Sequence, residues 1–349
     1  MATPPASNHT QTMQAMAVTK TVTADFGLAP ITMAVPACPP NGALLGLNAC
    51  GLCGSDVEKL RFKKATVGSI LGHEVVATIT ELGPQYQGEF QLGDRLALAH
   101  HVPCGTCVYC RHDAESMCGQ FKATNLTPGG FAEVIAVTGG HLANTAFKVP
   151  HHISNVQASA VEPLACVLKG IRRGALPGNT VLVIGLGYIG LLAAQVYTKQ
   201  GARVIGLDVR PDRIEQALEW GWITRGYTPE TLPTEPLHVD GVFTSMVTQT
   251  TMDTSLHHLR DGATLVLFSR GFGDPAPTLP CSDLYFRQIT VVPSYSPGLQ
   301  DLQQAAQWLF DGIIEAEALV SHTLSLEKLS EGLLAYQNGT ALKVVTTIH

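Results

Sequence analysis

The sequence predicts an α/β fold in which a doubly wound parallel sheet accompanies a second, mostly β domain. Residues 181–208 read as a strand, a glycine-rich turn, a helix and a second strand. Residues 13–137 hold short β-rich runs separated by Gly, Pro and Asn. The chain has 349 residues and 45% hydrophobic content, which is enough for two cores. We therefore expect two domains.

Composition excludes several classes of function. Lys and Arg number 22 against 28 Asp and Glu, and no basic cluster is present, so we expect no nucleic-acid partner. No apolar run reaches the roughly 20 residues that span a bilayer. Residues 1–12 are polar and lack the regions of a signal peptide, which predicts a disordered tail on a cytoplasmic protein. The nine cysteines are an odd number and favour metal ligation in a reducing compartment over a disulfide framework.

The β domain is predicted from five runs, whose sequences are MQAMAVTK, GALLGLNAC, HEVVATITEL, DRLALAH and FAEVIAV. The loops between them carry most of the Cys and His residues. Cys53 follows the second run, where we expect a short helix capped by Ser55 or Asp56. His73 and Glu74 lead directly into the third run. A thiolate and an imidazole from neighbouring loops suit Zn²⁺, although a lone Cys or His is more often an ordinary core residue.

Four cysteines follow at the spacing C-x2-C-x2-C-x7-C, namely Cys104, Cys107, Cys110 and Cys118. Four thiolates so close in sequence can wrap one tetrahedral ion and leave no open position, which predicts a structural zinc site. The alternatives are a redox C-x2-C pair and chance clustering.

An apolar-periodic segment predicts a helix over residues 155–174, with Pro163 as an irregularity. Glu162 is an acid in this otherwise apolar stretch, and a buried carboxylate requires a metal or a partner. Cys166 would share its helix face, either near that site or simply as a packed thiol.

The glycines Gly185, Gly187 and Gly190 fit G-x-G-x-x-G between an apolar strand and an apolar helix, with Tyr188 and Ile189 between them. In this context a pyrophosphate can approach the backbone and meet the helix N-terminus. The motif therefore predicts a dinucleotide site.

Asp208 closes the second strand, where its carboxylate would accept the adenine-ribose hydroxyls and repel a 2′-phosphate. This favours NAD over NADP. Arg210 and Arg213 could instead bind a 2′-phosphate. Alternatively, Arg213 could flank the adenine or be a solvated helix charge.

Further alternation of strands and helices continues the parallel sheet. We expect helices over 211–220 and 252–259 and strands over 239–246, 263–269 and 289–295. Two later helices, over 299–310 and 326–337, and a last strand over 343–348 are expected to return to the β domain.

With Cys53, the GHE of residues 72–74, the four-cysteine loop, VEPLAC and GLGYIG in this order, the chain resembles a zinc-dependent medium-chain dehydrogenase/reductase. The resemblance covers residue 13 to the C-terminus and lies within the alcohol and polyol dehydrogenase superfamily, in its sorbitol- and threonine-dehydrogenase-like branch. It implies a GroES-like catalytic domain over 13–167, completed by 301–349, and an NAD-binding Rossmann domain over 168–300.

The resemblance also implies roles for individual residues. Cys53 and His73 would hold a catalytic zinc, with Glu74 as a direct or alternating ligand and Glu162 near the third ligand position. Asp56 would orient His73. The zinc would lower the pKa of a substrate hydroxyl, and a hydride would then pass to the nicotinamide.

The resemblance also implies that Ser55 begins the proton path. This chain departs from the family at two positions. Glu58 stands where many relatives carry a relay histidine, so it either relays protons or is a solvated charge. Lys169 likewise replaces a histidine, as an anion-binding group or as the cationic end of a helix. For the pairs at 100–101 and 151–152, we expect at most one histidine of each to face a site, because adjacent residues on a strand point apart.

These observations predict an NAD-dependent zinc dehydrogenase that oxidises a secondary alcohol of a polyol, sugar or related polar metabolite. Two alternatives remain: an NAD-binding regulatory module, and an NAD-using isomerase or lyase of the same fold. The resemblance implies a homodimer or homotetramer, with no membrane partner.

Overall fold

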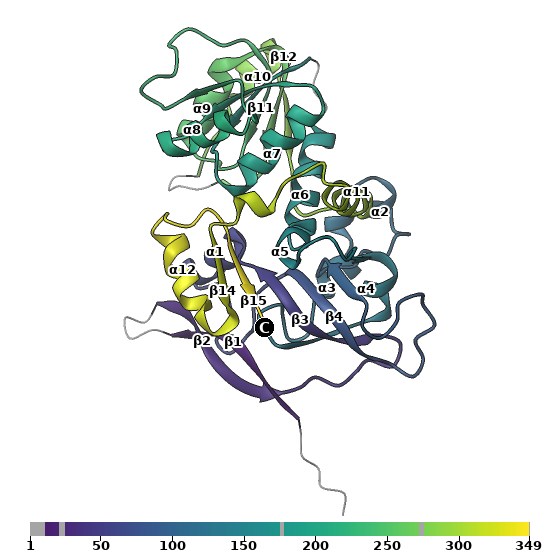
Figure 1. Cartoon of the computed structure of the whole chain (residues 1–349). Helices are drawn as coiled ribbons and strands as arrows, with labels where there is room; N and C mark the ends of the chain where they lie inside the picture. Colours follow the sequence, from purple (N-terminus) through teal and green to yellow (C-terminus); the bar gives the residue numbers. More distant parts are fainter. Residues whose placement is uncertain (1–10, 21–24, 175–177, 272–275, 349) are drawn as a thin grey trace, which may run out of the picture. The chain divides into compact units, whose positions relative to one another are not determined.

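The structure is a computed structural model that describes residues 11–20, 25–174, 178–271 and 276–348. The chain forms two compact units (Figure 1). The first comprises Met1–Val102, Gln120–Ser159 and Val320–His349, and the second Pro103–Gly119 and Ala160–Leu319. None of the helices in these described ranges has the length and apolar character needed to cross a membrane.

The first unit is mostly antiparallel β-structure, as predicted. Its larger sheet has seven strands in the order β14-β15-β3-β4-β5-β7, with β6 paired to β3. The strands are β3 (Ala43–Gly51), β4 (Glu74–Leu82), β5 (Arg95–Leu98), β6 (Val134–Val137), β7 (Ala146–Lys148), β14 (His322–Ser325) and β15 (Val344–Thr347). The helices are α1 (Gly54–Arg61), α3 (Gly119–Ala123), α4 (Gly139–Asn144), α5 (Asn155–Ala158) and α12 (Leu329–Gln337).

A separate antiparallel pair is formed by β1 (Thr12–Lys20) and β2 (Phe26–Ala34). The pattern of the sequence did not predict β2, because Gly27 and Pro30 interrupt it. Proline is tolerated here because β2 has one strand neighbour in its sheet and its other edge needs no donor. Residues 1–10 of the predicted tail lie outside the described residues, and Thr12, the last residue of that tail, begins β1.

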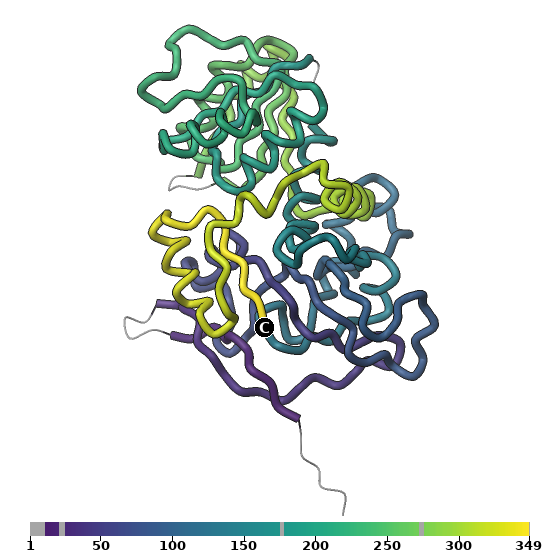
Figure 2. The backbone as a smooth tube through the Cα atoms, in the orientation of Figure 1, coloured from purple at the N-terminus to yellow at the C-terminus, as the bar shows by residue number. Residues whose placement is uncertain are grey.

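The C-terminal strand returns to the first unit, as expected. β15 pairs antiparallel with β3, with Val345 opposite Gly51, and Figure 2 shows the yellow C-terminal segment in the same unit as the purple N-terminal strands. Leu329 and Leu333 of α12 join the core of this unit. Residues from opposite ends of the sequence therefore complete one sheet.

The second unit contains the predicted parallel sheet, in the order β10-β9-β8-β11-β12-β13. The strands are β8 (Thr180–Ile184), β9 (Arg203–Leu207), β10 (Arg225–Tyr227), β11 (Val239–Thr244), β12 (Leu259–Leu267) and β13 (Thr290–Pro293). The helices are α2 (Val108–Arg111), α6 (Val161–Arg173), α7 (Tyr188–Lys199), α8 (Pro211–Glu219), α9 (Gln249–His258), α10 (Cys281–Arg287) and α11 (Leu299–Phe310). Strand order reverses beside β8, and such a reversal is where open α/β sheets bind ligands.

The helix predicted over 155–174 is divided into α5 and α6, with the break at Ser159 and Ala160. Pro163 lies in the first turn of α6, where its missing N–H costs no helical hydrogen bond. The predicted domain limit at 167/168 falls inside α6, whereas the compact units divide at 159/160, so the helix belongs as a whole to the second unit.

Two segments pack with the second unit although we expected them in the β domain. The helix over 299–310 is present as α11, but it packs against α6 instead of returning to the first unit. Residues 103–119, which carry the four cysteines, pack with the second unit as well. The physical reason is Arg172 of α6, which donates hydrogen bonds to Asp113 of the cysteine segment and to Asp301 of α11.

Candidate active site

Cys53 lies at the N-terminus of α1, directly after β3. Its Sγ accepts a hydrogen bond from the backbone N–H of Ser55 at 3.5 Å, and its own N–H donates to Oδ2 of Asp56 at 3.3 Å. The expectation that Ser55 or Asp56 caps the helix is therefore wrong. Cys53 is the cap, because the strand ends only two residues earlier and the chain turns into the helix at the thiol.

His73 lies beside a buried carboxylate. Its Nδ1 is 3.5 Å from Oδ1 of Asp56, which makes no hydrogen bond among the described residues. Burial alone lowers the pKa of His73, but the charges of Asp56 and Cys53 outweigh it and raise the net pKa well above its usual value. Burial alone raises the pKa of Asp56, but the charge of His73 outweighs it and the net pKa is lowered. With Nδ1 facing Asp56, Nε2 is the ring nitrogen left for a metal.

Cys53, His73 and Glu74 come together as the sequence predicted. One donor atom of each lies within 4.8 Å of the other two. A sulfur, a nitrogen and an oxygen at such separations fit Zn²⁺, and three protein donors leave a tetrahedral position open. The buried Oδ1 of Asp56 adds the acceptor that a metal-binding imidazole normally has on its far side.

Lys343 is a site residue that sequence reasoning missed. Its Nζ donates to Oε2 of Glu74 and, at 3.0 Å, to the carbonyl oxygen of Leu52. Lys343 and Glu74 are separated by 269 residues in sequence, and the pairing of β15 with β3 brings them together. A lysine at the start of the predicted final strand gave no signal of this role.

His100 and His101 follow the end of β5, so the strand alternation that we assumed for them does not apply. Their rings are 3.9 Å apart, and the His100 ring is 4.7 Å from that of His73. Burial lowers the pKa of His100 well below its usual value. Neither belongs to the group of donor atoms around Cys53. His151 and His152 are exposed in a turn.

Ser55 and Glu58 both lie on α1. Ser55 is exposed, and Glu58 is half-buried. The carboxylate of Glu58 is not part of the group of donors formed by Cys53, His73 and Glu74. Their roles in a proton path stay predictions.

Glu162 lies in the first turn of α6 and is buried, as predicted for a carboxylate in an apolar stretch. The thiol of Cys166, one helical turn later, donates to its Oε1 at 3.5 Å. Glu162 belongs to the second unit, whereas Cys53 and His73 belong to the first. Its place among the ligands of a catalytic metal therefore stays a prediction.

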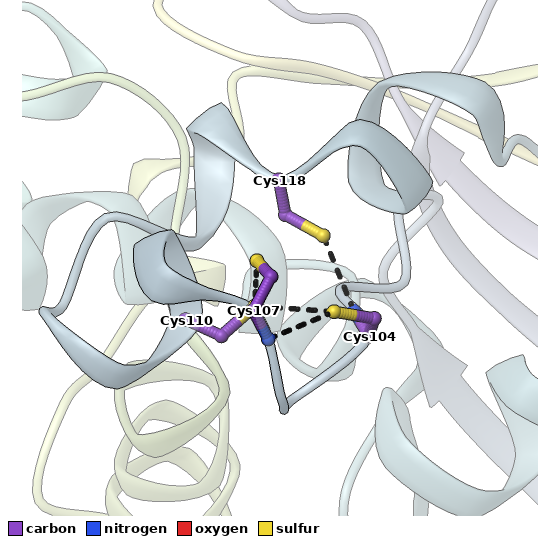
Figure 3. Close-up of side chains that lie close together, drawn as sticks. All are labelled: Cys104, Cys107, Cys110 and Cys118. Atoms are coloured by element: carbon purple, nitrogen blue, oxygen red, sulfur yellow. Dashed lines mark hydrogen bonds between the residues drawn. The ribbon is translucent and has the colours of Figure 1, made fainter.

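The four cysteines of the second unit point toward one another (Figure 3). Their Sγ atoms lie within 4.8 Å of one another. The backbone N–H of Cys107 donates to Sγ of Cys104 at 3.3 Å, and that of Cys104 donates to Sγ of Cys118 at 3.4 Å. Backbone donors around sulfur atoms stabilise thiolates, so this arrangement fits a closed four-thiolate metal site.

Cys104 and Cys110 have opposite tendencies to ionise. Hydrogen bonds from the backbone and hydroxyl of Thr106 lower the pKa of Cys104 to about 6. Burial and the thiol of Cys107 raise the pKa of Cys110 to about 12. A nearby cation would therefore favour the thiolate form of Cys110 at neutral pH.

Lys169 is fully buried in α6, so it is not a solvated cationic helix end. Its Nζ makes no hydrogen bond among the described residues. Burial lowers its pKa, while the charges of Glu115, Asp301 and Asp113 act in the opposite direction. A role for Lys169 as an anion-binding group stays a prediction.

The glycine-rich turn follows β8 at the point where strand order reverses. Gly185 has φ +86°, and a Cβ on it would lie 2.3 Å from Oγ of Ser245. A Cβ on Gly190 would lie 1.7 Å from the carbonyl oxygen of Gly185. Gly187 is the N-cap of α7, whose next residues, Tyr188 and Ile189, form its first turn. The turn thus lies at the N-terminus of α7, a position that fits a pyrophosphate.

Asp208 holds this turn in place. Its Oδ2 accepts the N–H of Leu186 at 2.6 Å, and its Oδ1 accepts that of Arg210 at 2.9 Å. Arg213 is not a purely solvated charge, since its Nη1 lies 3.7 Å from Oδ2 of Asp208 and 3.9 Å from a Cβ position on Gly187. Contact of Asp208 with an adenine ribose stays a prediction.

Comparison with known proteins agrees with this geometry. Residues 39–150 match the alcohol dehydrogenase GroES-like domain, and residues 189–311 match the zinc-binding dehydrogenase family. The chain is 31% identical to D-altritol 5-dehydrogenase of Agrobacterium fabrum over 83% of its own length and 87% of that protein. It is 26% identical to sorbitol dehydrogenase of Bombyx mori over 89% and 92% of the two chains.

A solved structure is similar over nearly the whole chain. Alcohol dehydrogenase TADH from Thermus sp. ATN1 superposes with a TM-score of 0.82 at 26% sequence identity, and the match covers 97% of this chain and 100% of the other. Both units are therefore related to those of one known enzyme.

Proposed function

The chain belongs to the zinc-dependent medium-chain dehydrogenases/reductases, and from that premise we propose that it is an NAD-dependent dehydrogenase of polyols or related polar metabolites. It is an oxidoreductase that acts on secondary alcohols. The observation that carries the proposal is the group of sulfur, nitrogen and oxygen donors from Cys53, His73 and Glu74 within 4.8 Å of one another.

The proposed catalytic zinc is held by Cys53 and His73, with Glu74 as a direct or alternating ligand and Glu162 near the third ligand position. When bound, zinc lowers the pKa of an alcohol and polarises a carbonyl, which supplies the chemistry in both directions. The protein residues orient the site: Asp56 faces Nδ1 of His73 and leaves Nε2 for the metal. Ser55 accepts the substrate proton in this proposal, and Glu58 passes it toward solvent.

The second proposed zinc is structural and is bound by Cys104, Cys107, Cys110 and Cys118. Their mutual approach within 4.8 Å supports it. Such a closed site contributes to stability and not to the reaction.

The proposed coenzyme is NAD. It would bind at the turn formed by Gly185, Gly187 and Gly190, with Asp208 as the ribose acceptor. Support comes from the burial of Asp208 and its hydrogen bond to Leu186, which place a negative charge beside the turn and disfavour a 2′-phosphate. Arg213 lies 3.7 Å from this carboxylate, and a comparison of NAD with NADP as coenzyme measures the preference.

The proposed substrate class is supported by the two relatives named for D-altritol and sorbitol. The test is a screen of NADH absorbance against polyols, sugars and amino alcohols, with NADP in parallel, on protein whose zinc content has been measured. We expect net NADH formation with a polyol and about two zinc ions per chain. A tightly held NAD without net reduction across the panel would instead indicate an isomerase or lyase.

We also propose that the protein is a homo-oligomer, a dimer or a tetramer, in the cytoplasm. The exposed aromatic residues Tyr285 and Phe286 of α10, near the edge strand β13, support self-association. The odd number of cysteines, four of them gathered as candidate metal ligands, supports a reducing compartment. Sedimentation analysis distinguishes the monomer, dimer and tetramer.

A further inference from the structure

A buried amine and a buried carboxylate of the second unit have orphaned polar atoms. Lys169 of α6 is fully buried, and Glu115, which opens the 3₁₀ turn η1 (Glu115–Met117), is 8% exposed. Neither Nζ of Lys169 nor Oε2 of Glu115 makes a hydrogen bond among the described residues. A buried charge is costly unless it is compensated, so each of these groups requires a counter-charge.

Glu115 lies beside a second buried carboxylate, that of Asp301. A Cβ on Gly298, the residue before α11, would lie 2.8 Å from Oε1 of Glu115 and 3.0 Å from Oδ2 of Asp301. Asp301 already has a cation, because Arg172 donates to its Oδ1 at 2.9 Å. Two carboxylates this close repel each other, and a single cation does not compensate both. Glu115 therefore needs a cation of its own.

Lys169 is placed to supply that cation. It lies three residues before Arg172 on α6, and residues three apart share one face of a helix. Burial lowers the pKa of Lys169, and among the charges that act against burial, that of Glu115 has the largest effect. In a buried region this attraction is only weakly screened. One face of α6 thus offers a cation to each of the two carboxylates.

The turn that begins at Glu115 leads directly to Cys118, one of the four proposed ligands of the structural metal. The N–H of Cys118 donates to the carbonyl oxygen of Glu115 at 2.9 Å, and Cys118 is 1% exposed. Sγ of Cys118 in turn accepts the N–H of Cys104 at 3.4 Å (Figure 3). A movement of Glu115 toward solvent would therefore carry the fourth sulfur away from the other three.

We propose that Lys169 is a positioning residue for the four-cysteine metal site: its charge keeps Glu115 buried, and Glu115 holds Cys118 at the fourth ligand position. The inference rests on the proposed structural zinc. Without the lysine, the carboxylate of Glu115 moves toward water to be solvated, and Cys118 is withdrawn from the metal.

The test measures metal affinity and not stability. Full-length protein is titrated with Co²⁺ against a chelator, and every protein carries Cys53→Ser, so that sulfur-to-metal charge-transfer absorption reports the four-cysteine site. We expect Lys169→Met to weaken Co²⁺ binding by about tenfold, the scale on which residues beside a metal's ligands act. Its charge-transfer absorption should fall toward that of Cys118→Ser, the reference with three thiolates.

A second substitution separates this role from general damage to the unit. Lys169→Met/Glu115→Gln also removes the charge that would seek water, so most of the lost affinity and absorption should return. Gln195→Met is the matched control, since Gln195 is 1% exposed in α7 of the same unit and its hydrogen bonds go to the backbone of Glu315. It should lower Tm without changing Co²⁺ affinity.

Three results would overturn the inference while leaving the metal site in place. They are unchanged affinity in Lys169→Met, an equal loss in Lys169→Met and the double variant, and an equal loss in Gln195→Met. If neither Lys169→Met nor Lys169→Gln folds, the lysine supports the unit as a whole, and the inference is also wrong. If the parent protein gives no four-thiolate Co²⁺ spectrum, the proposed structural metal itself fails.

Discussion

Arg172→Met should destabilise the second unit, because Arg172 holds the cysteine segment and α11 to α6. Its Nε and Nη2 donate to Asp301 at 2.9 and 3.1 Å, and its Nη1 and Nη2 donate to Asp113 at 2.9 and 2.7 Å. Methionine keeps the apolar stem and removes every donor. The substitution therefore isolates the ionic contacts.

The magnitude follows from the burial of the two carboxylates. The Asp301 side chain is 1% exposed, and removing one partner of a buried pair costs about 3–5 kcal/mol. The N–H of Gly298 continues to donate to Asp301 at 3.0 Å, which reduces that cost to about 2 kcal/mol. The Asp113 side chain is 32% exposed, so the loss of its ion pair with Arg172 adds about 0.5 kcal/mol to the destabilisation. A total of about 2–3 kcal/mol lowers Tm by about 5–10 °C in a unit of this size.

Tryptophan fluorescence during urea unfolding measures this effect selectively. All three tryptophans, Trp220, Trp222 and Trp308, lie in the second unit. Arg173→Met is the matched control, since Arg173 makes a 3.4 Å hydrogen bond to Pro293 and is 4.0 Å from Asp113. Equal free energies of unfolding for the two variants, within about 0.5 kcal/mol, would refute the reasoning.

Three further substitutions test the proposed sites. Cys53→Ser should abolish turnover and release one zinc per chain while circular dichroism stays unchanged, and retained activity would remove Cys53 from the catalytic site. Cys107→Ser should lower Tm and release the other zinc, because the three remaining thiolates no longer close the coordination sphere. An unchanged melting curve would argue against a structural metal. Asp208→Ala should raise the Michaelis constant for NAD by about tenfold and that for the alcohol far less. The substitution removes the acceptor of the Leu186 N–H at 2.6 Å, and Leu186 lies in the turn at which the coenzyme is proposed to bind. Equal increases in the two constants would contradict the coenzyme role.

Features that depend on residues close together in the chain were predictable from the sequence. The four cysteines lie within one segment of the chain, and the turn of Gly185, Gly187 and Gly190 follows from steric demands inside one strand–turn–helix unit. The parallel sheet was predictable too, because its buried strands read as continuous apolar runs, such as Val181, Leu182 and Val183, all fully buried.

Features that depend on where an element ends were less predictable. Cys53 and not Ser55 caps α1, and His100 lies beyond the end of β5, where strand alternation no longer orients its ring. In both cases a shift of one or two residues changes the direction of the side chain, and periodicity does not locate an element's end so finely.

The sequence by itself determined the family, the two kinds of sheet, the donor types around Cys53 and the four-thiolate loop, because each depends on residues close together in the chain. Only the tertiary structure decided that Lys343 neutralises Glu74, that Asp208 ties down the glycine turn, and that Arg172 binds the cysteine segment and α11 to α6. These contacts join residues that are not neighbours in the sequence, and the hydrophobic periodicity of the sequence does not indicate them. They arise because buried charges require partners, and folding alone determines which partner is near.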